Sequence, residues 1–213
     1  YLAFTYFGKK WLDGKFAKSL ETFRYQQDQD LEHYRYEINS LFNRITKIHE
    51  KEFEVLPEAW NKLVNAAGNV INSISPLQSY PDLNNMTAME IGEVLEKTSL
   101  AESQKIEILQ AEDKNKVYVH IANLKNLINA RNKVGELHNY LILYKIFLSK
   151  DLYDSFTKAD QLMVKDLDEL ELNNLPGGGF PGANFIAVRD ELISLMDMIE
   201  HQIQNRLHYD AAN

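Results

Sequence analysis

The residues best suited to chemistry are an arginine and a histidine that a helix would bring to one side. Arg131 and His138 are seven residues apart, which is two helical turns, and Asn132 follows the arginine directly. A fixed cation and a group that titrates near neutrality are what transfer of a phosphodiester requires. These three residues form the candidate catalytic site. The alternative is that Arg131 and His138 make ordinary polar contacts on the flank of a helix.

Two further groups of residues could form a binding site, but their spacing supports a site less well than that of Arg131 and His138. His201 and His208 share a face of the last expected helix, with Asp197 one turn before them, at no recognised metal-ligand spacing. The glycine-rich stretch 173–184 contains no Lys followed by Ser or Thr, which a phosphate-binding loop needs. We interpret the first group as a solvated helix face and the second as a connector. The sequence therefore predicts no metal and no cofactor.

The composition favours an all-α protein made of long helices. The chain has 213 residues, of which 45% are hydrophobic and 25% charged, with only 9 glycines and 5 prolines to punctuate it. Without cysteine it has no disulfide framework, thiolate zinc site or cysteine nucleophile. Its net charge of −8 disfavours nucleic-acid binding by the whole surface, so RNA is an unfavoured partner.

Apolar residues recur every three or four positions from Phe16 to Ile48, which predicts one long helix. Part of this helix has the spacing of a coiled-coil seam: Tyr34, Ile38, Leu41, Ile45 and Ile48. A stripe of that length exceeds what one small core can cover, so we expect a cyclic homo-oligomer, with an intramolecular helix as the alternative cover. The predicted domains are a long projecting helix at 1–50 and a helical bundle at 51–213.

Local signals predict where the remaining helices begin and end. Pro57 should kink or restart the first helix. Thr87 with Glu90, and Ser99 with Glu102, have the spacing of capping boxes that open two short helices. After Pro57 one face should be apolar through Trp60, Leu63, Val64, Ala67, Val70 and Ile71. The further expectations are a loop at 75–86, a central buried helix at 114–148, a helix capped by Ser149 and ending near 172, and a last helix at 185–209.

The first residues combine aromatic side chains with lysines: Tyr1, Phe4, Tyr6, Phe7, Lys9, Lys10 and Trp11. Aromatic rings favour the headgroup level of a bilayer, and lysines collect on the cytoplasmic side of a membrane span. This pattern predicts the cytosolic flank of a transmembrane helix that lies upstream of Tyr1. The expected location is the bacterial inner membrane, with the domain facing the cytoplasm. An amphipathic helix packed on the rest of the protein is the alternative.

The segment from Arg131 to His138 is similar to the Arg-polar-x₄₋₆-His signature of the HEPN family of helical ribonucleases. The resemblance implies that Arg131 stabilises phosphate charge and that His138 handles the proton of the ribose hydroxyl, with Asn132 at the polar position. A shorter Arg-to-His stretch, from Arg44 to His49, lacks the polar residue after the arginine.

Longer segments, at 23–26, 48–60 and 140–152, resemble a group of small bacterial proteins with one N-terminal transmembrane helix and a helical cytosolic domain. Among them are the HEPN-like, pore-forming accessory proteins of type VI-B CRISPR systems. The resemblance implies a membrane-anchored component of antiviral defence that oligomerises and perturbs the bilayer. Two other functions stay open, namely a ribonuclease that uses Arg131 and His138, and a non-catalytic helical scaffold that binds a partner protein.

Overall fold

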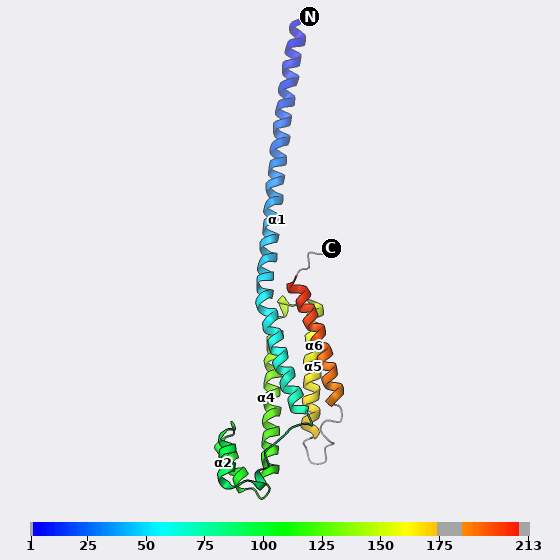
Figure 1. Cartoon of the computed structure of the whole chain (residues 1–213). Helices are drawn as coiled ribbons and strands as arrows, with labels where there is room; N and C mark the ends of the chain where they lie inside the picture. Colours follow the sequence, from blue (N-terminus) through cyan, green and yellow to red (C-terminus); the bar gives the residue numbers. More distant parts are fainter. Residues whose placement is uncertain (1, 174–184, 209–213) are drawn as a thin grey trace. The chain divides into compact units, whose positions relative to one another are not determined.

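The computed structural model describes residues 2–173 and 185–208, and side chains in these ranges from residue 14 onward. Every regular element of secondary structure among these residues is a helix, so the predicted all-α class is confirmed (Figure 1). The elements are α1 (Leu2–Ile74), η1 (Leu83–Asn85), α2 (Ala88–Glu96), α3 (Glu102–Gln110), α4 (Lys114–Tyr144), η2 (Lys145–Phe147), α5 (Lys150–Asn173) and α6 (Phe185–Leu207), where η denotes a 3-10 helix.

The chain divides into two units, Tyr1–Lys51 and Glu52–Asn213. This division lies one residue from the boundary that the sequence predicts between residues 50 and 51. Helix α1 contributes to both units, because it runs without interruption from Leu2 to Ile74. Unit 1 therefore consists of a single helical segment, and unit 2 holds every other element.

Pro57 neither ends nor restarts the helix, so of the two predicted effects, a kink or a restart, the restart is wrong. It lies inside α1, and its neighbours Val55, Leu56 and Ala59 are each at most 1% exposed. Proline removes one backbone hydrogen bond and clashes with the preceding turn. The burial of these neighbours in the core of unit 2 explains why the helix continues, since packing outweighs a local penalty.

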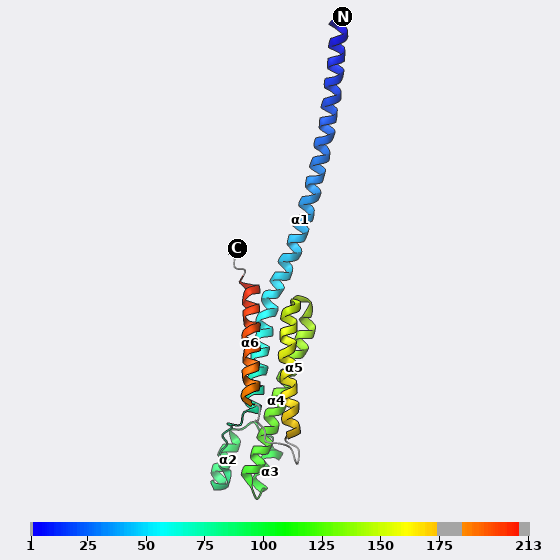
Figure 2. The ribbon, with the colours of Figure 1, turned by 90° about the vertical axis from the view of Figure 1, so that its right-hand side faces the viewer.

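Residues 52–74 of α1 form an antiparallel four-helix bundle with α4, α5 and α6 (Figure 2). Two hydrogen bonds show that α1 and α4 run in opposite directions. Ser73 donates to the carbonyl of Asn126, and Tyr140 donates to the carbonyl of Val55. The core mixes alanines with larger apolar side chains from all four helices. Its fully enclosed members include Ala59, Leu63, Ala66, Val70, Ala130, Leu137, Phe156, Ala159, Met163, Leu192 and Ile199.

A smaller apolar cluster lies where η1, α2 and α3 pack on the first half of α4. Its buried residues are Leu83, Ile91, Leu95, Ile108 and Ile121. Asparagine and aspartate side chains lace the connecting loops together, since Asn84 donates to Asp113 and Asn115 donates to Asp82. The described residues contain no strand and no disulfide, so burial and these hydrogen bonds hold the short helices in place.

One of the two predicted capping boxes is confirmed and the other is wrong. Thr87 accepts from the amide of Glu90, whose carboxylate accepts from Thr87 in return. The next helix instead begins at Glu102 after Ala101, and the amide of Ala101 donates to Gln104. Ser99 is drawn away from that helix because its hydroxyl and carbonyl both accept from the ammonium group of Lys125 on α4.

The other predicted boundaries differ only slightly from the structure. Ser149 accepts from the amide of Leu152 at the start of α5, and α4 gives way to η2 four residues before the predicted end. Val64, expected to face inward, is 40% exposed. The predicted connector lies outside the described residues apart from Asn173, and so does Tyr209. No helix in the described part of the chain has a stretch long and apolar enough to cross a membrane.

Candidate functional site

Helix α4 presents Arg131 and His138 to α5 at the border of its buried face. Ala130 and Leu137, the residues directly before them, are fully buried in the core. Each of the two polar residues therefore lies at the edge of that core, partly in contact with α5. The seven-residue spacing separates them by about 10 Å along the helix axis.

The guanidinium of Arg131 is held by two carboxylates of α5. It donates to Asp168 at 2.8 Å and forms a second ion pair with Glu171. The hydrogen bond to Asp168 raises the pKa of Arg131 further above its ordinary value, with the charge of Glu171 adding to the effect. Two negative groups thus already surround the cation that a phosphate would have to reach.

His138 is oriented by a buried carboxylate on the same partner helix. Its Nδ1 lies 2.7 Å from Oδ2 of Asp160, a residue only 5% exposed. Since Nδ1 is directed at this carboxylate oxygen, Nε2 is the ring nitrogen left for another partner. The other oxygen of Asp160, Oδ1, is buried with no hydrogen-bond partner among the described residues.

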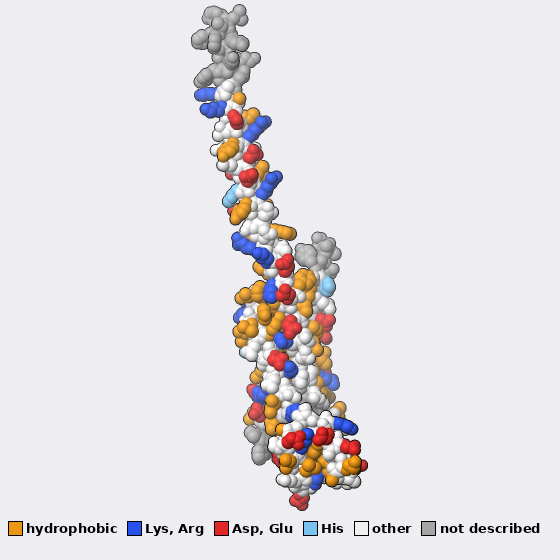
Figure 3. Space-filling model, turned by 90° about the vertical axis from the view of Figure 1, so that its left-hand side faces the viewer, with side chains coloured by type: hydrophobic (Ala, Val, Ile, Leu, Met, Phe, Trp, Pro, Cys, Tyr) orange, Lys and Arg blue, Asp and Glu red, His pale blue; other side chains and the backbone are white. Residues whose placement is uncertain are grey.

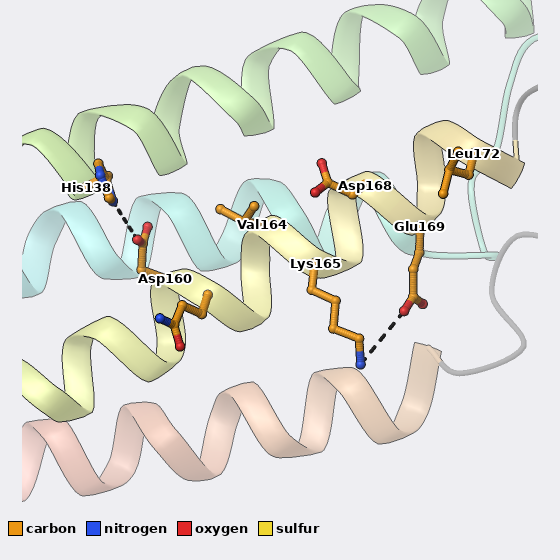
Figure 4. A pocket seen from close by; sticks show the side chains of 8 residues that line it. His138, Asp160, Val164, Lys165, Asp168, Glu169 and Leu172 are labelled. Carbon is orange, nitrogen blue, oxygen red and sulfur yellow. Dashed lines mark hydrogen bonds and ion pairs between the residues drawn. The ribbon is translucent and has the colours of Figure 1, made fainter.

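Two shallow recesses lie along the interface between α4 and α5. One, of about 480 Å³, is lined by His138, Asp160, Gln161, Val164, Lys165, Asp168, Glu169 and Leu172 (Figure 4). The other is lined by Arg131, Val134, Gly135, His138, Asn139, Val164 and Leu167. Asn132 is exposed and lines neither of these two recesses.

The structure therefore brings Arg131 and His138 to one recess and leaves Asn132 aside. Acidic side chains outnumber basic ones at this α4–α5 interface. Four carboxylates, from Asp160, Asp168, Glu169 and Glu171, lie beside Arg131, His138 and Lys165. Figure 4 shows Lys165 turned to Glu169, so this cation is also engaged. Such a surface favours cationic over phosphate ligands.

Sequence reasoning missed the carboxylates that hold these two residues. Asp160, Val164, Asp168 and Glu171 recur at four, four and three positions, which marks one face of α5. That periodicity was available, but the partner helix was not, since α4 and α5 meet only through tertiary packing. It also missed the ion pair of Arg206 with Glu52, in which a buried carboxylate of α1 accepts from the end of α6.

A second candidate is the coiled-coil seam of unit 1, defined as Tyr34, Ile38, Leu41, Ile45 and Ile48. All five side chains are exposed, Ile38 to 64% and Ile45 to 53%. Hydrophobic side chains recur along this helix in the space-filling view (Figure 3). Exposed apolar surface repeated at coiled-coil spacing marks a site of protein association.

The remaining predicted positions yield no site. The membrane-proximal set, Tyr1, Phe4, Tyr6, Phe7, Lys9, Lys10 and Trp11, lies outside the residues whose side chains are described. Asp197 and His201 are exposed on α6, and His208 is exposed directly after its last residue. Within the described ranges, no three His, Asp or Glu side chains lie close enough together to hold a metal ion.

Comparison of the chain with protein-family models, with curated proteins and with solved structures found no match.

Proposed function

We propose that this protein is a non-enzymatic, membrane-associated assembly protein, in which unit 1 joins copies of the chain and unit 2 is the folded body that each copy carries. The observation that carries the proposal is the exposed seam of unit 1. The sequence adds the aromatic and lysine residues before it, which would place one end of unit 1 at a bilayer. An antiviral effector that perturbs the membrane when it assembles fits this arrangement.

Two features of the seam argue for association over a bare solvated helix. Its residues are the large aliphatic and aromatic types that knobs-into-holes packing uses, at alternating spacings of three and four. The positions away from the seam carry charged residues such as Glu32, Lys47 and Glu50, as expected for a helix with one covered side. An isolated single helix of this length gains little stability without such packing.

The second candidate function is the ribonuclease. One observation favours it, namely that Arg131 and His138 line a common recess with His138 oriented by Asp160. Against it stands the engagement of Arg131 by Asp168 and Glu171, because an arginine that stabilises a transition state must be available to phosphate. The balance favours the assembly function.

Replacing Ile38 and Ile45 together with Asp tests the proposal. Both side chains are exposed, so the substitutions should leave unit 2 folded while they remove self-association. Sedimentation velocity should show the variant as a monomer, with the thermal unfolding of unit 2 unchanged. A matched control, Asn39→Asp with Asn43→Asp, adds the same charge off the seam and should leave the assembly intact. An assembly that survives the Ile38 and Ile45 changes would overturn the proposal.

A further inference from the structure

We propose that the unit-1 helices of two copies pair in antiparallel orientation, as a two-stranded coiled coil with its two-fold axis between Asn39 and Ser40. The inference rests on the proposed self-association and specifies its partner and orientation. It depends on the heptad pattern and on the charges beside it, both of which lie within unit 1.

The heptad positions follow from the spacing of the apolar residues. Leu31, Ile38 and Ile45 occupy position a, and Tyr34, Leu41 and Ile48 occupy position d. All six side chains are exposed in the structure. Toward the N-terminus the pattern breaks, because Gln27 and Arg24 take the next d and a positions.

An antiparallel pair places each a residue opposite a d residue of the second copy. When Ile38 faces Leu41, Ile45 faces Tyr34 and Leu31 faces Ile48. Every layer is then apolar, and the two-fold axis repeats each layer with the two copies exchanged. A shift by one heptad in either direction breaks this match. One shift sets Tyr34 against Glu52, whose carboxylate is already buried in unit 2 and paired with Arg206. The other shift sets Ile45 against the polar side chain of Gln27. Neither shift gives three fully apolar layers, so this register is the favoured one.

The flanking charges favour the same register. In it, Glu37 lies beside Arg44 of the second copy and Asp30 lies beside Lys51, and symmetry makes each pair twice. On the other flank, Arg35 meets the ring of Phe42, a contact of the cation–π type. Residues at the e and g positions set orientation and partner choice in coiled coils.

A parallel pair gives fewer favourable contacts. Its flanks would set Asp30 beside Arg35, which is attractive, but Glu37 beside Phe42 and Arg44 beside His49. It would also bring Arg24 of both copies to a shared a position at the end of the seam. Charge complementarity therefore favours the antiparallel orientation.

The orientation determines how the assembly would meet a membrane. In an antiparallel pair the N-terminal ends of the two seams point in opposite directions. Since the two-fold axis is perpendicular to the coil, both N-terminal flanks reach one bilayer only when the coil lies along it. A parallel pair would instead stand with both flanks at one end.

Spin labels on the full chain distinguish the two orientations. The chain lacks cysteine, so Thr22→Cys and Asn43→Cys each give one labelled site, and both positions are exposed at the outer f position of the heptad. Double electron–electron resonance should show a separation of about 50 Å between the two labels at position 22 and a much shorter one between the two labels at position 43. Short separations at both sites would overturn the antiparallel inference and leave self-association standing. The absence of a dipolar signal in both labelled variants would overturn the antiparallel inference and the proposed self-association.

Charge reversal gives an independent test of the register. Glu37→Lys and Arg44→Glu should each weaken dimerisation about tenfold, because each change turns a symmetric pair of attractions into repulsions. The double variant, or a mixture of the two single variants, restores opposite charges only when residue 37 faces residue 44. We expect both to dimerise within about threefold of the unchanged protein. Absence of rescue in both would contradict the register.

Discussion

Single ionisable residues inside unit 2 have environments that the sequence does not reveal. Asp166 on α5 is 5% exposed, and its Oδ2 is buried without a hydrogen-bond partner in the described part of the chain. Burial raises the pKa of this carboxyl to about 6, and the charge of Glu169 adds to the effect, with Lys165 opposing it and Glu191 of α6 assisting. A buried carboxylate of this kind weakens the fold when it ionises.

We therefore expect Asp166 to make unit 2 less stable as the pH rises. The pKa of Asp166 is higher in the folded chain than in the unfolded chain, so its contribution is fully present below pH 4 and is lost as the pH rises through about 6. Asp166→Asn should remove this dependence and raise the free energy of unfolding at pH 7.5 by about 1–2 kcal/mol. Urea titrations at pH 5 and pH 7.5 check this.

The control for this prediction is Asp154→Asn, an exposed position on the same helix. It should change stability by less than about 0.5 kcal/mol at both pH values. Equal pH dependence in Asp166→Asn and the unchanged protein would show that another group is responsible.

The sequence located Arg131 and His138 on one helix flank, since helical spacing alone decides that. It could not show that Asp168 and Glu171 engage the arginine, because these contacts form only when α4 and α5 pack. It also offered no reason to set Asn132 apart from the other two. The direction of a side chain beside a core depends on which neighbouring helix covers the face.

We expect no significant ribonuclease activity from the unchanged protein. The carboxylates at Arg131 repel phosphate, and the overall charge of −8 does not attract RNA. Incubation with a labelled single-stranded RNA measures the rate. Robust cleavage that is lost in both Arg131→Ala and His138→Ala would contradict this expectation and favour the catalytic function.

Individual helices were largely predictable, because periodicity and caps are local properties. The beginning of α2 follows from the capping box of Thr87, and that of α5 from Ser149. Two local signals failed where tertiary contacts were stronger: Ser99 bonds Lys125 of α4, and Pro57 is carried through by the buried residues around it. Both failures mark places where packing overrides a local preference.

Pro57 should therefore be a removable strain in α1. Its side chain is exposed, so Pro57→Ala restores a backbone donor and removes the clash without opening a cavity. We expect the free energy of unfolding of unit 2 to rise by about 1–3 kcal/mol. Gly68→Ala is the matched comparison: an added Cβ meets nothing within 4 Å, and the expected gain is about 1 kcal/mol. Destabilisation by Pro57→Ala would show that the fold requires the proline.

At the scale of the whole molecule, the division into a single helix and a bundle reflects where apolar residues find partners within one chain. The apolar face of residues 55–70 is covered by α4, α5 and α6, whereas the seam at 34–48 is exposed. The sequence predicted the seam but not its cover, because one chain does not specify what a second copy contributes.

Membrane association belongs to this scale as well. We expect the protein, made by its own cell, to fractionate with membranes and to stay there through a high-salt wash, because aromatic side chains anchor independently of charge. Immunoblotting of the membrane and soluble fractions measures this. Complete recovery in the soluble fraction without detergent would contradict membrane association and leave the assembly proposal unaffected.

The central claim is that copies of this chain assemble through unit 1, and its most direct test is the mass of the unmodified protein in solution. One chain has a mass of 24.7 kDa. Light scattering coupled to size exclusion, with mild detergent present and over a range of micromolar concentrations, reports that mass without any label or substitution. The account predicts a whole multiple of 24.7 kDa that falls toward one chain on dilution. A mass of 24.7 kDa at every concentration would contradict it.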